Sequence, residues 1–194
     1  MEFKFENKVL CPLDPSTELF QHYPAYYGVK NEILQTNFPD AKIIGEIGVR
    51  AGYSAWAFLQ ACPGAEFHGF DMEDPAYGGS DGKFSKWAID LLKDYNFNYH
   101  KINSQEVDTL MEGKEFDFIH VDGDHTKGGV MHDLDICLKA LSPNPKAFLL
   151  IDDYSHPQLP AVKEGVDEWL ENNKDKVVYE YKPSLRGEIV IHRK

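Results

Sequence analysis

Apolar and polar residues follow two alternating patterns from Lys42 to the end of the chain. Short apolar runs rich in β-branched and aromatic residues are typical of buried strands. Apolar residues spaced three or four apart are typical of helices that cover a sheet. The first pattern predicts strands at residues 42–47, 66–70, 98–102, 116–121, 147–151, 177–181 and 188–192. The second predicts helices at residues 53–61, 83–95, 127–141 and 160–172, with a short helix around Leu110 and Met111.

Strands that alternate with helices form a parallel sheet whose two faces are both covered. Only a short turn near Pro183 and Ser184 separates the last two strands, so these two form an antiparallel hairpin. The sequence therefore predicts a Rossmann-like, doubly wound α/β fold. The sheet is expected to be mostly parallel, with helices on both faces and an antiparallel hairpin at its C-terminal edge.

The 194 residues suit a single domain, with residues 42–194 as the α/β core and residues 1–41 as an N-terminal lead-in. Four prolines interrupt the lead-in, and one helix is predicted there at residues 25–36. Its aromatic residues are more typical of core packing or of a dimer face than of a lid over a substrate. A homodimer is therefore left open.

The chain is acidic, with 32 acidic and 20 basic side chains and a formal net charge of −12. Such a charge repels a phosphate backbone and an anionic membrane surface, so neither nucleic acid nor a membrane is an expected partner. Three cysteines without metal-type spacing indicate free thiols in a reducing compartment. The sequence shows no secretion signal and no apolar run of membrane-spanning length, so a cytoplasmic protein is expected.

The segment IIGEIGVRAGYS, residues 43–54, runs from a predicted strand through two glycines into a predicted helix. Glycines allow a tight turn and a close approach to a ligand, and the first N–H groups of the following helix point toward it. A dinucleotide site would need Gly-x-Gly-x-x-Gly, whereas this chain has Glu46-x-Gly48-x-x-x-Gly52. The spacing disfavours a nicotinamide oxidoreductase and favours a nucleoside without phosphates. Asp71, which ends the next strand, is placed to accept hydrogen bonds from both ribose hydroxyls.

Acidic residues also follow the fourth and fifth predicted strands. The carboxyl ends of neighbouring parallel strands meet at one edge of the sheet, so Asp122, Asp152 and Asp153 can converge, and converging like charges need a cation. Carboxylate oxygens favour Mg²⁺, with Mn²⁺ or Ca²⁺ as alternatives. The competing interpretation is that Asp124 and Asp153 only cap turns or helices and that no metal binds.

Five segments together resemble the successive motifs of class I S-adenosylmethionine (SAM)-dependent methyltransferases: EIGVRAGYS, HGFDM, INSQE, FDFIHVDGDH and FLLIDDY. The resemblance extends from about Lys42 to the end of the chain. HVDGDH, followed by a helix and IDDY, is more narrowly similar to the small O-methyltransferases that use a divalent metal. These include the macrolide-sugar and catechol types and their cephalosporin-hydroxylase-like relatives. Where the catechol-type enzymes have Asp followed by Asn, this chain has Asp152 followed by Asp153, which adds a charge to the implied site.

Carried onto the matching positions, the resemblance implies a set of contacts with SAM. The implied contacts are Glu46, Gly48, Gly52 and Ser54 around the methionine part, Asp71 at the ribose, Met72, Ser104 and Gln105 at the adenine, and Asp122. Ser54 and Gln105 have an ordinary alternative role as polar residues in the first turn of a helix.

In the metal-dependent O-methyltransferases that this sequence resembles, the cation holds a substrate hydroxyl and lowers its pKa. The methyl group then passes in line from the sulfonium to the oxygen. A base is still needed for the substrate proton. His125 and His156 are expected at the rim of the site, where imidazole titrates in the right range, and Lys127 is a further candidate. The catechol-type enzymes use a lysine near this place that has no counterpart here, so the identity of the base stays open.

The sequence thus predicts SAM-dependent methyl transfer to a hydroxyl of a small molecule, assisted by a divalent metal. Two alternatives remain. One is a SAM-binding protein that transfers no methyl group, and the other is a cephalosporin-hydroxylase-like relative. The acceptor cannot be read from the sequence, because specificity in this fold lies in loops and in the N-terminal segment.

Overall fold

The computed structural model describes residues 4–14, 22–75, 79–106, 111 and 113–194 of the chain. Its strands are β1 (Ile43–Ile47), β2 (Glu66–Asp71), β3 (Phe97–Lys101), β4 (Phe118–Val121), β5 (Phe148–Ile151), β6 (Val177–Lys182) and β7 (Glu188–Arg193). Its α-helices are α1 (Tyr23–Asn37), α2 (Tyr53–Ala61), α3 (Lys83–Leu91), α5 (Lys127–Ala140) and α6 (Pro160–Asn172). Two short 3₁₀ helices are η1 (Asn7–Val9) and η4 (Ser104–Glu106).

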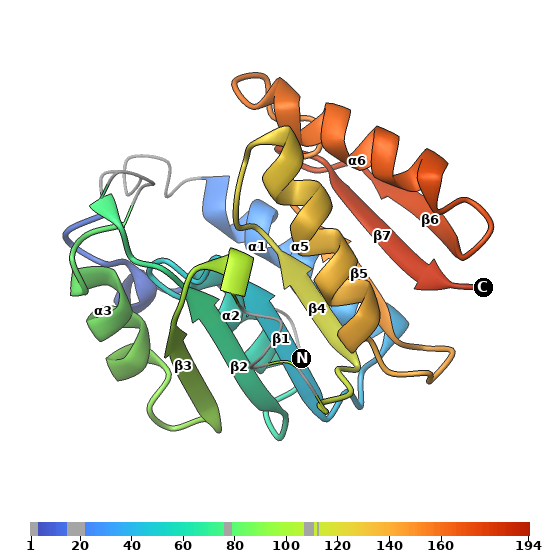
Figure 1. Cartoon of the computed structure of the whole chain (residues 1–194). Helices are drawn as coiled ribbons and strands as arrows, with labels where there is room; N and C mark the ends of the chain where they lie inside the picture. Colours follow the sequence, from blue (N-terminus) through green and yellow to red (C-terminus); the bar gives the residue numbers. More distant parts are fainter. Residues whose placement is uncertain (1–3, 15–21, 76–78, 107–110, 112) are drawn as a thin grey trace.

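The seven strands form one sheet in the order β3-β2-β1-β4-β5-β7-β6 (Figure 1). Strands β1 to β5 are parallel to one another, and β7 runs antiparallel to both β5 and β6. The order along the chain reverses between β1 and β4, which is the place where ligands bind in open α/β sheets. The predicted fold class is confirmed.

The register of the central strands fixes which residues meet at that place. Ile47 of β1 pairs with Val121 of β4, and Val121 pairs with Ile151 of β5. The next residue of each strand therefore leaves the sheet at the same level. Gly48, Asp122 and Asp152 are brought together in this way.

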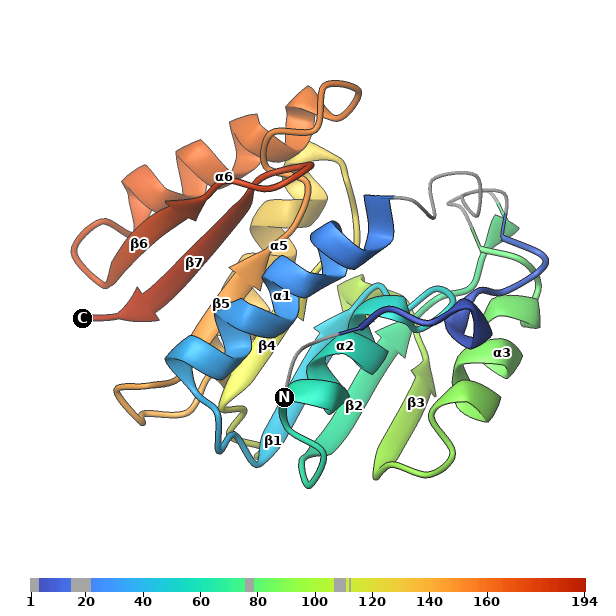
Figure 2. The same cartoon turned by 180° about the vertical axis from the view of Figure 1, so that it is seen from behind.

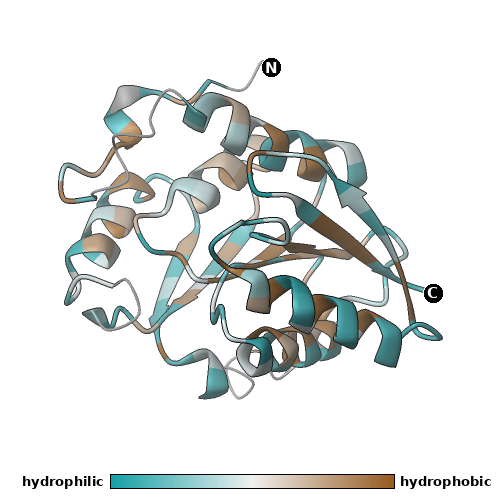
Figure 3. Cartoon of the chain, turned by 90° about the horizontal axis from the view of Figure 1, so that it is seen from above, coloured by the Kyte–Doolittle hydropathy of each residue, from teal (hydrophilic) through white to brown (hydrophobic). Residues whose placement is uncertain are grey.

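Helices cover both faces of the sheet, with α1, α2 and α3 on one face and α5 and α6 on the other (Figures 1 and 2). Seen from above, the central strands are mostly hydrophobic, and the outer surfaces of the covering helices are mostly hydrophilic (Figure 3). Helix α2 is an exception, because its residues 53–59 are all buried. Helix α1 lies beside α2 on the same face of the sheet, and the N-terminal segment passes over α2 (Figure 2), so residues 53–59 are enclosed on all sides.

The N-terminal segment is part of the same core. The ring of Phe5 lies 5.4 Å from that of Tyr23, 5.8 Å from that of Tyr53 and 5.7 Å from that of Trp56. The backbone N–H of Cys11 donates to the Tyr53 hydroxyl at 2.9 Å. These contacts hold the lead-in over the start of α2, directly beside the glycine turn.

Two predicted boundaries were wrong by several residues. Helix α3 ends at Leu91, not at Tyr95, because the chain must turn at Leu92–Tyr95 to enter β3. Strand β4 begins at Phe118, two residues later than predicted, because the backbone of Phe116 pairs with that of Leu141 and not with β1 or β5. The short helix predicted around Leu110 falls mainly outside the described residues. None of the helices that are described combines the length and apolar composition needed to cross a membrane.

Candidate functional site

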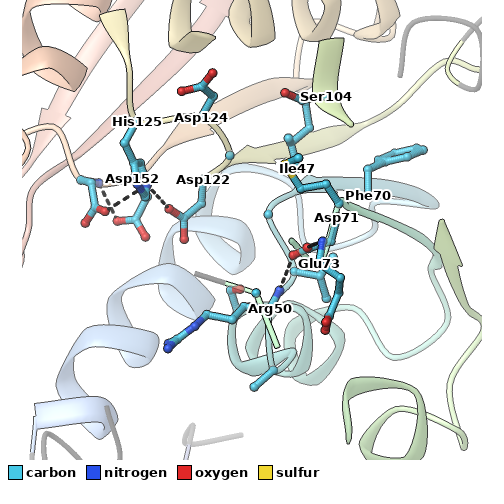
Figure 4. A pocket seen from close by; sticks show the side chains of 18 of the residues that line it. Ile47, Arg50, Phe70, Asp71, Glu73, Ser104, Asp122, Asp124, His125 and Asp152 are labelled. Atoms are coloured by element: carbon cyan, nitrogen blue, oxygen red, sulfur yellow. Dashed lines mark hydrogen bonds and ion pairs between the residues drawn. The ribbon is translucent and has the colours of Figure 1, made fainter. Parts of the chain in front are cut away.

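A pocket of about 800 Å³ opens at the carboxyl ends of β1, β2, β3, β4 and β5. This volume lies within the range of about 300–1,000 Å³ that is usual for small-molecule sites. Figure 4 shows two groups of polar side chains on its walls: Asp71 and Glu73 lie beside Arg50 at one end, and Asp122, His125 and Asp152 lie at the other. We call these the nucleoside end and the acidic end.

The glycine turn after β1 forms the floor between the two ends. Gly48 has a φ of +89°, and a Cβ added there would lie 1.8 Å from the backbone oxygen of Asp122. No side chain fits at this position, so the β1 and β4 loops approach each other through bare backbone. Gly52 also has a positive φ, of +79°, and precedes the first turn of α2, where Ser54 lines the pocket. The first N–H groups of this helix therefore face the cavity.

The carboxylate of Asp71 is fixed at the nucleoside end. Its Oδ2 accepts the backbone N–H of Arg50 at 2.7 Å, and its Oδ1 accepts the backbone N–H of Glu73 at 2.7 Å (Figure 4). Each oxygen keeps a further lone pair for a ligand in the pocket. Arg50 adopts a φ of +47° to make its contact, and its guanidinium pairs with the buried Asp14 at 2.9 Å. The site thus presents a preoriented carboxylate to the pocket.

The residues predicted at the adenine also line the nucleoside end. Met72 follows β2, and Ser104 and Gln105 follow β3 in η4. The backbone N–H of Gln105 is held by the Asn103 side chain at 3.0 Å. The structure therefore brings together Asp71, Met72, Ser104 and Gln105 from two neighbouring strand ends.

Glu46 lies elsewhere. Its side chain is fully buried and is not among those that line the pocket, because it points from β1 toward His120 of β4. The Nδ1 atom of His120 lies 2.8 Å from Glu46 Oε1, and Oε2 has no hydrogen-bond partner within the described part of the chain. Burial raises the pKa of Glu46 well above its usual range. A contact between Glu46 and the cofactor stays a prediction. It would require the Glu46 carboxylate to leave this buried position.

The three predicted metal ligands, Asp122, Asp152 and Asp153, belong to two groups of side chains at the acidic end, each of which includes a histidine. Ligand atoms of Asp122, His125 and Asp153 lie within 4.8 Å of one another, and so do those of His120, Asp122 and Asp152. We call the first the outer group, since His125 is exposed, and the second the inner group, since His120 and Asp152 are buried. Asp122 belongs to both.

Asp152 of the inner group is held by helix α1. The Lys30 ammonium lies 2.9 Å from Asp152 Oδ2, and the Tyr26 hydroxyl donates to the same oxygen. Burial alone would lower the pKa of Lys30, but the charges of Asp152 and Glu188 outweigh it and raise that pKa. Burial likewise opposes ionisation of Asp152, and Lys30 nevertheless holds the pKa of Asp152 below its usual range. This is a buried ion pair of full charges.

Asp122 and Asp153 of the outer group share His125. His125 Nε2 lies 3.3 Å from Asp122 Oδ1 and 3.5 Å from Asp153 Oδ2 (Figure 4). The hydrogen bond to Asp122 raises the pKa of His125 to about 9, while burial and the charge of Asp152 raise the pKa of Asp122 to about 6. Arg186, from the turn before β7, pairs with Asp153 Oδ1 at 3.1 Å. Lys30, His125 and Arg186 therefore give each of the three carboxylates a cationic partner from the chain itself.

The candidates for a base differ in position. His125 lines the pocket, but with a pKa of about 9 it holds its proton at neutral pH and donates to the carboxylates. His156 does not line the pocket, and its Nδ1 accepts the backbone N–H of Gln158 at 3.2 Å. Lys127 also lies outside the pocket and pairs with Glu168 at 2.7 Å. The identity of the base stays a prediction, with His125 as the candidate nearest the acidic end.

The capping interpretation holds for one aspartate. Asp124 Oδ1 accepts the backbone N–H of Thr126 at 2.8 Å, which fixes the turn before α5, and Thr126 itself caps that helix. Asp153 instead directs its carboxylate to Arg186 and His125.

Three residues at this site escaped the sequence-based reasoning: Tyr26, Lys30 and Arg186. For Lys30 a signal was present. It lies three and four residues from Tyr26, Tyr27, Ile33 and Leu34 in helix α1, which puts a lysine in the middle of an apolar helix face. Arg186 follows a turn and carries no comparable signal.

A methyltransferase-domain family matches residues 46–154, and no curated protein sequence matches the chain. The fold is similar to the O-methyltransferase from Bacillus cereus in complex with SAH, with a TM-score of 0.70, 14% identity, and coverage of 99% of this chain and 93% of that one. It is also similar to the O-methyltransferase TomG from Streptomyces achromogenes, involved in tomaymycin synthesis and solved with SAM, with a TM-score of 0.69, 15% identity, and coverage of 98% and 91%. An rRNA methylase from Streptococcus thermophilus gives a TM-score of 0.63 at 13% identity, covering 86% and 95%.

At 13–15% sequence identity, the similarity to these three solved structures shows a shared fold alone. The three proteins are also named for different acceptors. The family match is more specific, because it begins at Glu46 in β1, just before the glycine turn, and ends at Tyr154, just beyond the acidic end. It confirms the resemblance found in the sequence motifs and spans more than half of the 194 residues. The chain therefore belongs to the methyltransferase-domain family.

Proposed function

We propose that this chain is a SAM-dependent methyltransferase that transfers a methyl group to a hydroxyl of a small molecule, assisted by a divalent cation. One observation carries the proposal. A single pocket joins a preoriented carboxylate, Asp71, to a second group of carboxylates and an imidazole at its other end. A nucleoside cofactor and an acceptor can therefore meet within one cavity.

The nucleoside end fits SAM. Asp71 offers lone pairs on both oxygens to the ribose hydroxyls, and the side-chain-free Gly48 lets the rest of the cofactor lie against the backbone. Two of the structural neighbours, TomG and the Bacillus cereus enzyme, were solved with SAM and SAH. The sulfonium would then lie toward the acidic end, where carboxylates favour a positive charge.

The acidic end fits a divalent cation at the outer group. Its two carboxylates supply the hard oxygen donors that Mg²⁺ or Mn²⁺ prefers, and an imidazole nitrogen completes a set of ligand atoms within 4.8 Å of one another. Asp122, Asp153 and His125 would hold the ion. When bound, such a cation would lower the pKa of an acceptor hydroxyl.

The chain's own residues shape the acceptor side. Tyr23, Tyr26 and Tyr27 of α1 line the pocket and give it an aromatic wall. Arg186 lies over the Tyr26 ring at 5.2 Å and closes the wall beside Asp153. An aromatic wall beside polar groups suits a small hydroxylated ring compound, and the net charge of −12 disfavours RNA.

Cofactor binding can be tested by titrating the purified protein with SAM and SAH in a calorimeter. Asp71→Asn should weaken binding by about 1.5–3 kcal/mol, which is the value of hydrogen bonds to a charged group. That is about 10- to 150-fold in Kd. Asp94→Asn removes the same charge from an exposed position outside the pocket, so its Kd should equal that of the wild type. If millimolar SAM does not bind, the proposal is wrong.

Methyl transfer can be tested with a panel of phenols, catechols and sugars, each with and without chelator. Turnover that the chelator abolishes supports the full proposal. Turnover that survives the chelator contradicts the role of the cation. Binding of SAM without turnover on any acceptor would favour the alternative of a SAM-binding protein.

A further inference from the structure

Lys30 occupies the inner group of the acidic end. Its ammonium is fully buried and lies 2.9 Å from Asp152 Oδ2, 3.3 Å from His120 Nε2 and 3.5 Å from Glu188 Oε1. These partners come from the ends of three adjacent strands, β4, β5 and β7, whereas Lys30 comes from α1 on the face of the sheet. One helix side chain thus reaches the place where the inner carboxylate and imidazole converge.

The contacts of Lys30 also fix the tautomer of His120. An ammonium can only donate, so His120 Nε2 accepts from Lys30, and Nδ1 carries the ring proton toward Glu46 Oε1 at 2.8 Å. The lone pair that a metal would need on Nε2 is therefore already in use.

Asp152 is equally occupied. Its Oδ2 accepts from Lys30 and from the Tyr26 hydroxyl, and its Oδ1 accepts the backbone N–H of Asp153 at 2.8 Å. His120 Nε2 and Asp152 Oδ2 are 3.9 Å apart. An ion at about 2–2.5 Å from both atoms would lie within about 4 Å of the Lys30 ammonium. The two positive charges would repel each other in a buried place.

We propose that Lys30 is a built-in cation that closes the inner group to divalent metals, so that Asp152 anchors α1 and only the outer group is left for an exogenous ion. This departs from the expectation that Asp122, Asp152 and Asp153 share one metal. It rests on the proposed function for the cation at the outer group. The exclusion at the inner group rests on the contacts of Lys30 alone.

The outer group differs from the inner group in its exposure and in its cationic partners. His125 and Asp122 line the pocket and are partly exposed, so an ion can reach them. Within the part of the chain that is described, the cationic partners of these carboxylates are His125 and Arg186. His125 becomes a ligand once it loses its proton, and Arg186, which pairs with Asp153, is partly exposed. Neither is a buried ammonium at the centre of the group.

The test uses Mn²⁺ alone as the probe, measured by electron paramagnetic resonance on the purified full chain without cofactor or acceptor. Asp152→Asn and Asp153→Asn form a matched pair, because they make the same change at adjacent residues. We expect the Kd for Mn²⁺ to change less than about 3-fold in Asp152→Asn and to rise by more than about 10-fold in Asp153→Asn, because loss of a group that only orients a ligand already costs about 10- to 100-fold. The reverse order would overturn the inference.

A second comparison removes the ammonium. Lys30→Met alone would leave the buried Glu188 and Asp152 without their cation, so it is combined with Glu188→Gln, which removes one of these charges. The double variant should bind an additional Mn²⁺ that disappears when Asp152→Asn is added. Glu188→Gln alone is the control and should bind the same number of ions as the wild type. Circular dichroism and thermal unfolding confirm that each variant is folded.

If the folded double variant binds no more Mn²⁺ than the wild type, the inference is overturned. This holds also in the case that the wild type binds no Mn²⁺. Titration of the same samples with SAH separates this result from the proposed function. A chain that follows the Mn²⁺ pattern but binds no SAH would contradict the proposed function and still support the role of Lys30.

Discussion

Asp133 of α5 is a buried carboxylate directly behind the loop of the acidic end. Its Oδ2 accepts the backbone N–H of Asp124 at 3.3 Å, and its Oδ1 has no hydrogen-bond partner in the part of the chain that is described. Burial raises the pKa of Asp133 from 3.8 to about 6. Asp133→Asn replaces it with a neutral side chain of the same shape that can still accept the Asp124 N–H.

The shift of the Asp133 pKa sets the expected effect. Between pH 3.8 and about 6 the folded chain keeps this proton while the unfolded chain loses it, so the wild type loses stability as pH rises through this window. A shift of roughly two pKa units corresponds to roughly 3 kcal/mol. The asparagine does not titrate. At pH 4 part of this difference is already lost, so the free energy of unfolding of the variant, relative to that of the wild type, should rise by roughly 2.4 kcal/mol from pH 4 to pH 7 and stay nearly constant above that.

Urea unfolding followed by circular dichroism at pH 4, 5, 6, 7 and 8 measures this difference. Asp94→Asn, at an exposed position of the same charge, checks for a general effect of removing one negative charge from an acidic chain. A difference between Asp133→Asn and the wild type that does not change with pH would refute the reasoning. So would a variant that is less stable than the wild type at pH 8 by more than about 1 kcal/mol, the value of one hydrogen bond.

Three further outcomes follow from the geometry. Gly48→Ala places a Cβ 1.8 Å from a backbone oxygen at a φ of +89°, so it should lower the free energy of unfolding by more than about 2 kcal/mol and abolish SAH binding in calorimetry. Tyr53→Phe leaves the Cys11 N–H without its acceptor, so it should cost about 1–3 kcal/mol and speed hydrogen exchange at Cys11; unchanged exchange would contradict the contact. Chelation should stop methyl transfer and leave the Kd for SAH unchanged, because Asp71 lies at the other end of the pocket; a weaker Kd would contradict the separation of the two ends.

Local pattern was enough to predict most of the fold. Helices α2 and α6 lie at residues 53–61 and 160–172 as predicted, since a glycine turn and a proline mark where they begin. The β6–β7 hairpin follows from its short turn. The boundary that was missed at β4 depends on the pairing of Phe116 with the distant Leu141, and a local pattern does not contain this contact.

The site was predictable where strand order determines it. Asp71, Asp122 and Asp152 lie at strand ends, and the parallel sheet brings these ends together. The partners of these carboxylates were missed. The position of Lys30 in an apolar face of α1 indicates a buried charge but not which carboxylate it meets, and Arg186 in the final turn carries no signal. Their charges change what Asp152 and Asp153 can do, and only the packing of the whole chain reveals them.

The buried Lys30 has a consequence for how members of this fold can exchange their N-terminal segments. A chimaera that brings residues 1–41 from a relative without this lysine would leave Asp152 and Glu188 as two uncompensated charges inside the protein. A graft that brings the lysine to a sheet without those acids would bury an unpaired ammonium. The lysine at position 30 must therefore be inherited together with the strand ends that it meets.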